Sequence, residues 1–269
     1  MENKREEIDL QGLKLVKETP PVPSKKYPIL FIHGMCGGAL LWDNYMRFFS
    51  ARGYVCYAIN LRGHHGSRPV RNIGKVSLRD YLQDIEDVIK VLGNPVIIAH
   101  SMGTLLTQKI IERYTLPGVI LLCPVGTREI VTITTPEMVK ATIKNIFKLI
   151  LGLPLLPDKR TIIITQLNKL PPHTQEIICS RFVPESGRAL FQILFPGLHV
   201  DASKIHTPML IVGGSEDVTV PPAITLKVAQ KYKADFREYQ GVGHMPHWES
   251  CWRDIAQDIA EWLERKGCS

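Results

Sequence analysis

The apolar positions of the chain fall into two alternating patterns, short continuous runs and longer amphipathic stretches. A short continuous apolar run is typical of a strand buried on both faces of a parallel sheet. Apolar residues spaced three and four apart are typical of a helix that covers such a sheet. The runs predict strands at 29–32, 55–60, 95–99, 118–123 and 209–213. The amphipathic stretches predict helices at 42–52, 78–92, 104–114 and 222–232.

The pattern at the two ends of the chain differs from that of the centre. Residues 1–9 mix both charge signs, and we expect them to be solvated. Residues 10–18 alternate apolar and polar side chains, which predicts an edge strand. Four prolines within 19–28 then interrupt regular structure. Towards the other end, a strand is predicted at 235–239 and a last helix from Trp248.

Between residues 126 and 200 the alternation of strands and helices stops. This segment shows helix-like pieces separated by prolines, and 162–164 is its one strand-like run. Repeated strand–helix alternation elsewhere predicts an α/β fold, a mostly parallel central sheet with helices on both faces. We therefore expect a core domain formed by 1–125 and 201–269, with 126–200 inserted as a helical cap over the functional site.

Composition narrows the classes of protein to which the chain can belong. A hydrophobic content of 45% and a charged content of 22% are ordinary for a globular domain. No apolar run approaches the ~18 residues of a membrane span, and the first residues lack a signal-peptide pattern. Six scattered cysteines without C-x-x-C spacing indicate reduced thiols, so we expect a cytoplasmic protein. The net charge of +7 is dispersed, which disfavours nucleic-acid binding.

The stretch from Pro95 to Thr107 contains the strongest candidate chemistry. A predicted strand ends at Ala99-His100-Ser101-Met102-Gly103, and a helix-compatible run follows at once. A serine on such a tight corner has its hydroxyl lifted clear of the sheet, in the arrangement called a nucleophile elbow. Ala99 takes the place of the usual first glycine and is still small. We expect Ser101 to be a nucleophile.

A serine nucleophile needs a base and an acid that orients the base. Functional groups of a parallel sheet gather at the carboxyl ends of its strands. Asp217 follows the strand at 209–213, and His244 follows the strand at 235–239. The chain order Ser, Asp, His matches the one expected for this elbow. Glu216 is the alternative acid and His247 the alternative histidine, and we prefer Asp217 and His244.

The negative oxygen that forms during acyl transfer needs two N–H donors. We expect these to be the backbone N–H groups of Met102 and of Met35, in the glycine-rich loop after the strand at 29–32. Further side chains near these loops are expected to contact substrate: His33, Gly34, Cys36, His100, Phe147 and Val218. The sequence has no H-E-x-x-H motif and no cysteine–histidine cluster, so we expect neither a metal site nor a cofactor.

Taken together and in this order, the motifs resemble the α/β-hydrolase superfamily, specifically its capped serine esterases and lipase-like members. The resemblance implies the α/β-hydrolase fold and a Ser-His-Asp site. Serine at position 101 argues against the epoxide hydrolases and haloalkane dehalogenases, which carry aspartate there. The matching segments are 33–38, 61–64, 99–103, 214–217 and 243–249.

The expected function is hydrolysis of a carboxylic ester through an acyl-enzyme intermediate. Two alternatives stay open: the same triad acting on a C–C bond, an amide or an acyl transfer, and a binding or receptor protein with the hydrolase fold. We expect a lipophilic small-molecule ester with a short-to-medium acyl chain, hydrolysed in solution without interfacial activation. The enzyme is expected to be a monomer or homodimer without nucleic-acid partners.

The predicted cap carries many apolar side chains, which we expect to pack onto the core and to close a lipophilic tunnel. The same segment holds nine Lys/Arg against five Asp/Glu, and we expect these charges to form a solvated face. A basic face that binds an anionic substrate or a lipid surface is the alternative. The apolar side chains are Ile143, Ile146, Phe147, Ile150, Leu151, Leu153, Leu155, Leu156, Phe191, Leu194 and Phe195.

Overall fold

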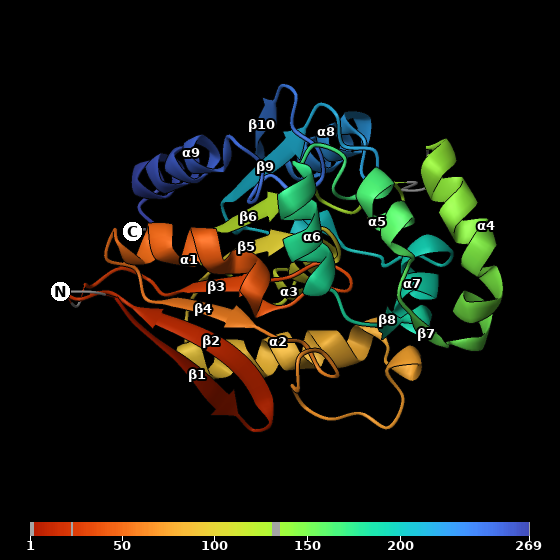
Figure 1. The fold of residues 1–269 in the computed structure, drawn as a ribbon. Coiled ribbons are helices and arrows are strands. Elements are labelled where there is room, and N and C mark those ends of the chain that lie inside the picture. Colours follow the sequence, from red (N-terminus) through yellow and green to blue (C-terminus); the bar gives the residue numbers. More distant parts are fainter. Residues whose placement is uncertain (1–2, 23, 131–134, 269) are drawn as a thin grey trace.

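A central sheet of eight strands organises the computed structural model, which describes residues 3–22, 24–130 and 135–268 (Figure 1). The strand order is β1-β2-β4-β3-β5-β6-β9-β10. Strands from β4 to β10 pair in parallel, whereas β2 runs antiparallel to both β4 and β1. The strands are β1 (Lys4–Leu10), β2 (Leu13–Thr19), β3 (Ile29–Ile32), β4 (Cys56–Ile59), β5 (Val96–His100), β6 (Val119–Leu122), β9 (Met209–Gly214) and β10 (Asp235–Tyr239).

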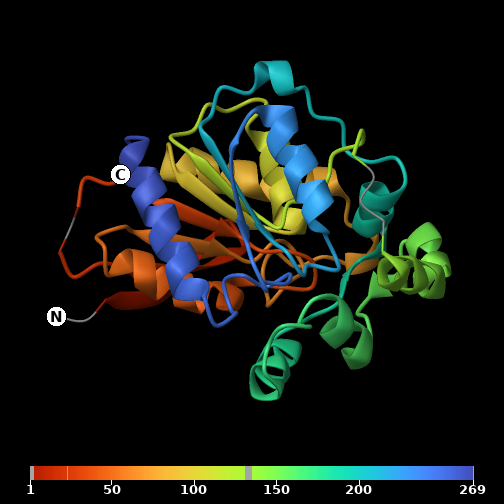
Figure 2. The same ribbon diagram turned by 90° about the horizontal axis from the view of Figure 1, so that it is seen from above.

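Helices cover both faces of this sheet, which confirms the expected fold class (Figure 2). Two helices pack on one face, α1 (Asp43–Ser50) and α9 (Trp252–Arg265). Three pack on the other: α2 (Leu78–Leu92), α3 (Met102–Ile110) and α8 (Pro222–Tyr232). Short 3-10 turns occupy Ala39–Trp42, Ile73–Lys75 and Ala202–Lys204. None of the helices within the described ranges combines the length and apolar character needed to cross a membrane.

The segment between β6 and β9 lies beyond the carboxyl ends of the parallel strands (Figure 1, right). Proline at the N-terminal end and glycine at the C-terminal end bound its longest helix, as expected for these residues. A two-stranded antiparallel pairing ties its two halves together. Its elements are α4 (Pro136–Leu151), β7 (Pro154–Leu155), α5 (Lys159–Thr165), α6 (Pro172–Ser180), β8 (Glu185–Ser186) and α7 (Gly187–Leu194).

The bounds predicted for β3, α8 and β10 are confirmed, while three other predictions need correction. Residues 4–10 form the edge strand β1, because Gln11 and Gly12 at positive φ make a two-residue hairpin turn onto β2. Residues 162–164 are helical, because the Asp158 side chain caps the start of α5. The last helix begins at Trp252 rather than Trp248. Residues 1–2, 23, 131–134 and 269 of the predicted segments lie outside the described ranges.

Candidate active site

Ser101 occupies a strained corner between strand β5 and helix α3. Its backbone has φ 50° and ψ −121°, a conformation that non-glycine residues rarely adopt. Two glycines allow the close approach of the neighbouring chain. A Cβ on Gly103 would lie 2.7 Å from a carbonyl oxygen of β3, and one on Gly34 would lie 2.9 Å from the Ser101 Cβ. The turn residues therefore bring the serine against the loop that follows β3.

Three side chains from separate loops form a hydrogen-bonded chain at this corner. His244 Nε2 lies 3.0 Å from Ser101 Oγ, and His244 Nδ1 lies 2.8 Å from Asp217 Oδ2. Asp217 follows β9 and His244 follows β10, so all three sit beyond the carboxyl ends of parallel strands. With the Nδ1 proton directed at the carboxylate, Nε2 is left to accept the serine proton. The arrangement suits removal of a proton from Ser101.

The two alternative residues of this region lie elsewhere. Glu216 forms an exposed ion pair with Lys169, 2.6 Å away. His247 stacks on Trp42 with ring centroids 4.7 Å apart, and burial lowers its pKa to about 3. Asp217 by contrast is buried, and its second oxygen accepts the N–H groups of Thr219 and Val220. These bonds fix the carboxylate that faces His244.

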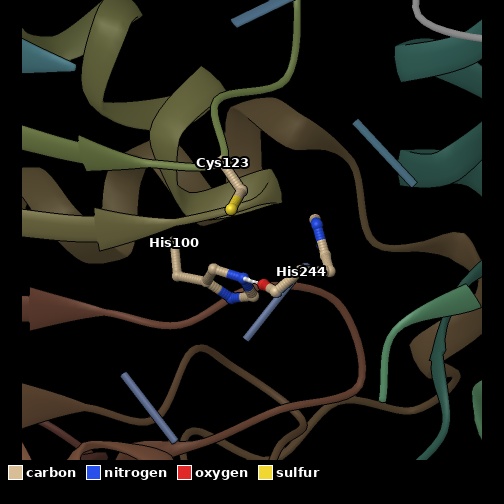
Figure 3. Close-up of side chains that lie close together, drawn as sticks. All are labelled: His100, Cys123 and His244. Carbon is tan, nitrogen blue, oxygen red and sulfur yellow. Dashed lines mark hydrogen bonds between the residues drawn. The ribbon is translucent and has the colours of Figure 1, made fainter. Parts of the chain in front are cut away.

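His100, Cys123 and His244 lie close together, as Figure 3 shows. Their nitrogen and sulfur atoms lie within 4.8 Å of one another, which is the spacing of possible metal ligands. His100 Nε2 donates to the His244 carbonyl oxygen at 2.7 Å, and burial keeps the pKa of His100 well below its usual value. Both nitrogens of His244 already face Ser101 and Asp217. A metal here would have to displace one of them, so the cluster fits the positioning of His244 better than metal binding.

The loop after β3 places Met35 at the cavity next to Ser101. His33 holds this loop, because its Nδ1–H donates to the Gly34 oxygen at 2.7 Å and its Nε2 accepts the Leu61 N–H at 3.2 Å. Burial lowers the pKa of His33 to about 3, which keeps the ring neutral in this role. Met102 is the first residue of α3, where backbone N–H groups have no partner within the helix.

A cavity of about 90 Å³ opens on Ser101 and His244. Most of its wall comes from the segment between β6 and β9 rather than from the core. The exposed surface of the wall is mainly apolar. Its polar side chains, besides those of Ser101 and His244, are Thr142, Asn145, Thr161, Thr165, Gln166 and Thr219. The apolar lining includes Met35, Met138, Ala141, Leu149, Leu155, Pro157, Leu190 and Leu194.

The side chains predicted to contact substrate are not the ones that form this lining. Gly34 packs against Ser101, while His33, Cys36 and His100 are buried and do not line the cavity. Thr219 rather than its neighbour Val218 reaches the wall. Phe147 does not meet its prediction, because its side chain points away from the cavity and is 78% exposed on the outer side of α4.

One buried carboxylate that the sequence did not single out connects the inserted segment to the loop after β3. Glu185 is completely buried, and its Oε2 accepts the Cys36 N–H at 3.1 Å and faces His64 Nε2 at 3.2 Å. Its Oε1 accepts the Tyr81 hydroxyl. Cys36 has a positive φ of 60° and directly follows Met35. Glu185 lies 149 residues after Cys36 in the chain, and its bond to Cys36 fixes the backbone beside Ser101.

The pKa values of Glu185 and His64 indicate an ion pair. Burial is the largest single influence on Glu185 and opposes its charge. The His64 imidazolium and the hydrogen bonds from His64, Tyr81 and the Ser186 N–H together outweigh burial and lower the pKa of Glu185 to about 2. Burial likewise opposes the charge on His64, and the Glu185 carboxylate raises the pKa of that ring above its usual value. Each charge stabilises the other in an environment closed to water.

A second overlooked carboxylate, Glu249, holds the loop that carries His244. Its oxygens accept the N–H groups of Gly243 at 2.9 Å and of Met245 at 3.2 Å, on either side of the histidine. Burial raises the pKa of Glu249. The spacing of Glu249 after His244 was visible in the sequence, but a glutamate at a helix start has the simpler explanation of a capping residue. Nothing in the sequence around Glu185 indicates a partner so distant.

Comparison with known proteins places this geometry in context. The model of the alpha/beta hydrolase family matches residues 29–258. Among solved structures, a monoacylglycerol lipase of Paleococcus ferrophilus superposes with a TM-score of 0.73 at 20% identity, covering 99% of this chain and 100% of that one. A thermophilic esterase of Thermogutta terrifontis gives 0.72 at 18% identity, covering 98% and 99%. At such identities the likeness shows the fold.

A curated sequence relative covers less of the molecule. Epoxide hydrolase 1 of Caenorhabditis elegans is 32% identical over 88 residues, which are 32% of this chain. The match spans 22% of the length of that protein.

We predict that Glu185→Gln destabilises the fold in a pH-dependent way. Loss of one partner of a buried ion pair costs about 3 kcal/mol. Because the pKa of His64 is raised in the folded protein, the stabilisation by the pair is fully present below about pH 6.5, the usual histidine pKa. It is lost as the pH rises through the higher pKa of His64 in the folded state. Because the pKa of Glu185 is lowered, the stabilisation from its ionised carboxylate is lost only as the pH falls from about 4.5 towards about 2. Urea unfolding at pH 5.5 and pH 9 measures the difference.

The free-energy difference between wild type and variant should be large at pH 5.5 and smaller at pH 9. Glu176→Gln is the matched control, because Glu176 forms an exposed pair with Lys159. A Glu185→Gln effect that is equal at both pH values would contradict the ion pair.

Proposed function

The chain belongs to the alpha/beta hydrolase family, and from this premise we propose that it is a serine hydrolase that cleaves carboxylic esters through an acyl-enzyme intermediate. One observation carries the proposal. Ser101 Oγ, His244 and Asp217 form a continuous hydrogen-bonded chain whose serine end opens on an apolar cavity. Such a chain supplies a nucleophile, a base and an orienting acid in the required geometry.

In the proposed reaction, His244 Nε2 takes the Ser101 proton as Oγ attacks the ester carbonyl carbon. The tetrahedral intermediate collapses when the C–O bond to the alcohol breaks, and the alcohol leaves with the proton from His244. Water then attacks the acyl-enzyme with the same histidine as base, and the acid product departs. Asp217 keeps the imidazole in the tautomer needed for both halves.

The negative oxygen of each intermediate would be held by the N–H groups of Met102 and Met35. Support comes from the position of Met102 at the first turn of α3 and of Met35 at the wall of the Ser101 cavity. The partial positive charge of a helix N-terminus adds to the effect of these donors. His33 and Glu185 would act as positioning residues for the Met35 loop.

We also propose that residues 126–200 act as a cap that selects the acyl chain. The support is that α4, α5 and α7 line most of the cavity above Ser101. A cavity of about 90 Å³ with mainly apolar walls suits a short-to-medium acyl chain. The lipase and esterase names of the solved relatives agree with ester chemistry. The epoxide hydrolase relative matches a limited segment, and a serine at position 101 favours an acyl-enzyme.

Ser101→Ala is expected to abolish acyl-enzyme formation without unfolding the protein. The hydroxyl is the only group removed, and its neighbours remain packed around the corner. Labelling by a serine-reactive fluorophosphonate, followed by mass spectrometry, should show a single adduct in the wild type and none in this variant. Ser180→Ala, on an exposed helix end, should label like the wild type. Full labelling or wild-type ester hydrolysis in Ser101→Ala would refute the assignment.

Asp217→Asn and Glu216→Gln form a matched pair that tests the orienting acid. If Asp217 sets the His244 tautomer, its change to asparagine should lower kcat by roughly 10⁴ with KM little altered. Glu216→Gln should stay within about twofold of wild type, because this side chain pairs with Lys169 at the surface. The measurement is steady-state hydrolysis of a p-nitrophenyl ester. A reversed ranking of the two variants would show that the wrong acid was chosen.

The acyl-chain preference is tested with p-nitrophenyl esters of two to sixteen carbons. Each methylene that the cavity buries contributes about 0.8 kcal/mol, so kcat/KM should rise up to about fourfold per carbon until the cavity is filled. Beyond a short-to-medium length it should fall. Leu194→Ala should move the maximum to longer chains, since Leu194 lines the cavity, whereas exposed Leu226→Ala should not. A maximum at sixteen carbons would contradict the proposal.

A further inference from the structure

The longest helix of the inserted segment presents an apolar surface to solvent. We call this surface the α4 outer face and define it by Val139, Ile143, Phe147 and Ile150. Ile143 is 66% exposed, Phe147 78% and Ile150 62%. Both views place α4 at the outer edge of the molecule, away from the sheet (Figures 1 and 2). Three of the side chains that were expected to close a tunnel, Ile143, Phe147 and Ile150, therefore point outwards. Leu155 and Leu194 of the same set do line the Ser101 cavity.

This exposure is concentrated rather than scattered. Of the fourteen large hydrophobic side chains that are exposed within the described ranges, seven lie between Val139 and Leu156. The opposite side of α4 supplies Met138, Ala141 and Leu149 to the Ser101 cavity. The helix is thus apolar on two sides, although one side would suffice to pack it on the core. A contiguous exposed apolar surface marks a site of interaction.

Basic side chains lie beside the α4 outer face. Lys140, Lys144 and Lys148 follow one another at four-residue spacing and are all exposed. Lys144 pairs with Asp158, whereas Lys140 and Lys148 have no ion pair among the described residues. Lys140, Lys144 and Arg160 also line a surface groove of about 330 Å³ between α4 and α5, where Glu137 is the one acidic side chain of the lining. The surroundings of the apolar surface are therefore positively charged.

We propose that the α4 outer face docks on the surface of an anionic lipid bilayer. A helix that combines large apolar side chains on one side with lysines beside them fits the boundary between acyl chains and negatively charged headgroups. A second copy of the chain fits less well, because lysine is depleted from protein–protein interfaces and like charges would be brought together. The lipid surface is the occupant that satisfies both the apolar and the charged groups.

The docked orientation would leave α4 between the lipid and the Ser101 cavity, with the basic groove beside it. Ala141, Thr161 and Thr165 line both the basic groove and the Ser101 cavity, so one layer of residues separates the two spaces. An ester dissolved in the bilayer would then be concentrated beside the site that hydrolyses it. The docking itself goes beyond the proposed hydrolysis and does not depend on it, since binding can be measured with the Ser101→Ala protein.

The test is co-sedimentation of the full chain with phosphatidylcholine vesicles that contain either one quarter phosphatidylglycerol or none. We expect binding to the anionic vesicles in 0.1 M NaCl, at least tenfold weaker binding to the neutral ones, and a clear loss of binding in 1 M NaCl, where charges are screened within about 3 Å. The double variant Ile143→Ser/Ile150→Ser and the double variant Lys140→Glu/Lys148→Glu should each bind at least tenfold more weakly than wild type.

Val91→Ser/Leu226→Ser is the matched control, because it removes two exposed apolar side chains far from α4 in the sequence and should bind like wild type. Unchanged melting temperatures show that the variants are folded. Absence of binding to anionic vesicles, equal binding to neutral vesicles, or equal binding by all three variants would overturn the proposal. A dimer in solution that Ile143→Ser/Ile150→Ser dissolves, without vesicle binding by the wild type, would identify a second copy as the occupant instead.

Discussion

The close approach of the β5–α3 corner to strand β3 is the constraint on which the site depends. Ser101 has a positive φ, a conformation that costs about 1–3 kcal/mol and persists only where the surroundings enforce it. Here the Ser101 N–H donates to the Leu122 oxygen at 3.1 Å, and Gly103 packs against the carbonyl groups that end β3. The packing of the sheet and of helix α3 thus sets where the Ser101 hydroxyl points. The loops that carry Asp217 and His244 then place these side chains in a hydrogen-bonded chain with that hydroxyl.

Buried polar groups then hold those loops by their backbone rather than by direct contact with Ser101. His100 bonds the carbonyl of His244, Glu249 bonds the amides on either side of it, and Glu185 bonds the amide of Cys36. A buried carboxylate is stable only when its oxygens are satisfied, so the bonds made by Glu249 and Glu185 also fix these two side chains. Positions around the serine are therefore determined redundantly, as a preorganised site requires.

Sequence patterns anticipated those parts that depend on neighbouring residues. Strand β3 and helix α8 follow from local apolar periodicity. The positions of Asp217 and His244 near Ser101 follow because loops after parallel strands meet at one edge of the sheet. The role of Glu185 could not be predicted from the sequence, because its partners Cys36 and His64 are more than a hundred residues away. The side of α4 that faces the cavity was also predicted wrongly, as exposed Phe147 shows. The apolar periodicity of α4 is real, but periodicity does not say which of two apolar sides faces the core. The strand at 4–10 was not predicted, because charged side chains alternate with its few apolar ones in an exposed hairpin.

The Cys36 amide donates a hydrogen bond to Glu185, which links the loop after β3 to a segment that is synthesised much later. The sheet strands β3, β4, β5 and β6 can pair as soon as residue 122 has been synthesised. The Cys36 amide beside Met35 still lacks its bond to Glu185 until residue 185 follows. A nascent or truncated chain could therefore contain Ser101 in a folded half-sheet and still lack an ordered pocket beside it. In the same way, local unfolding of the inserted segment would remove the Glu185 bond from the Met35 loop, while the bonds of His33 remain. The site is thus complete only when the insertion is folded.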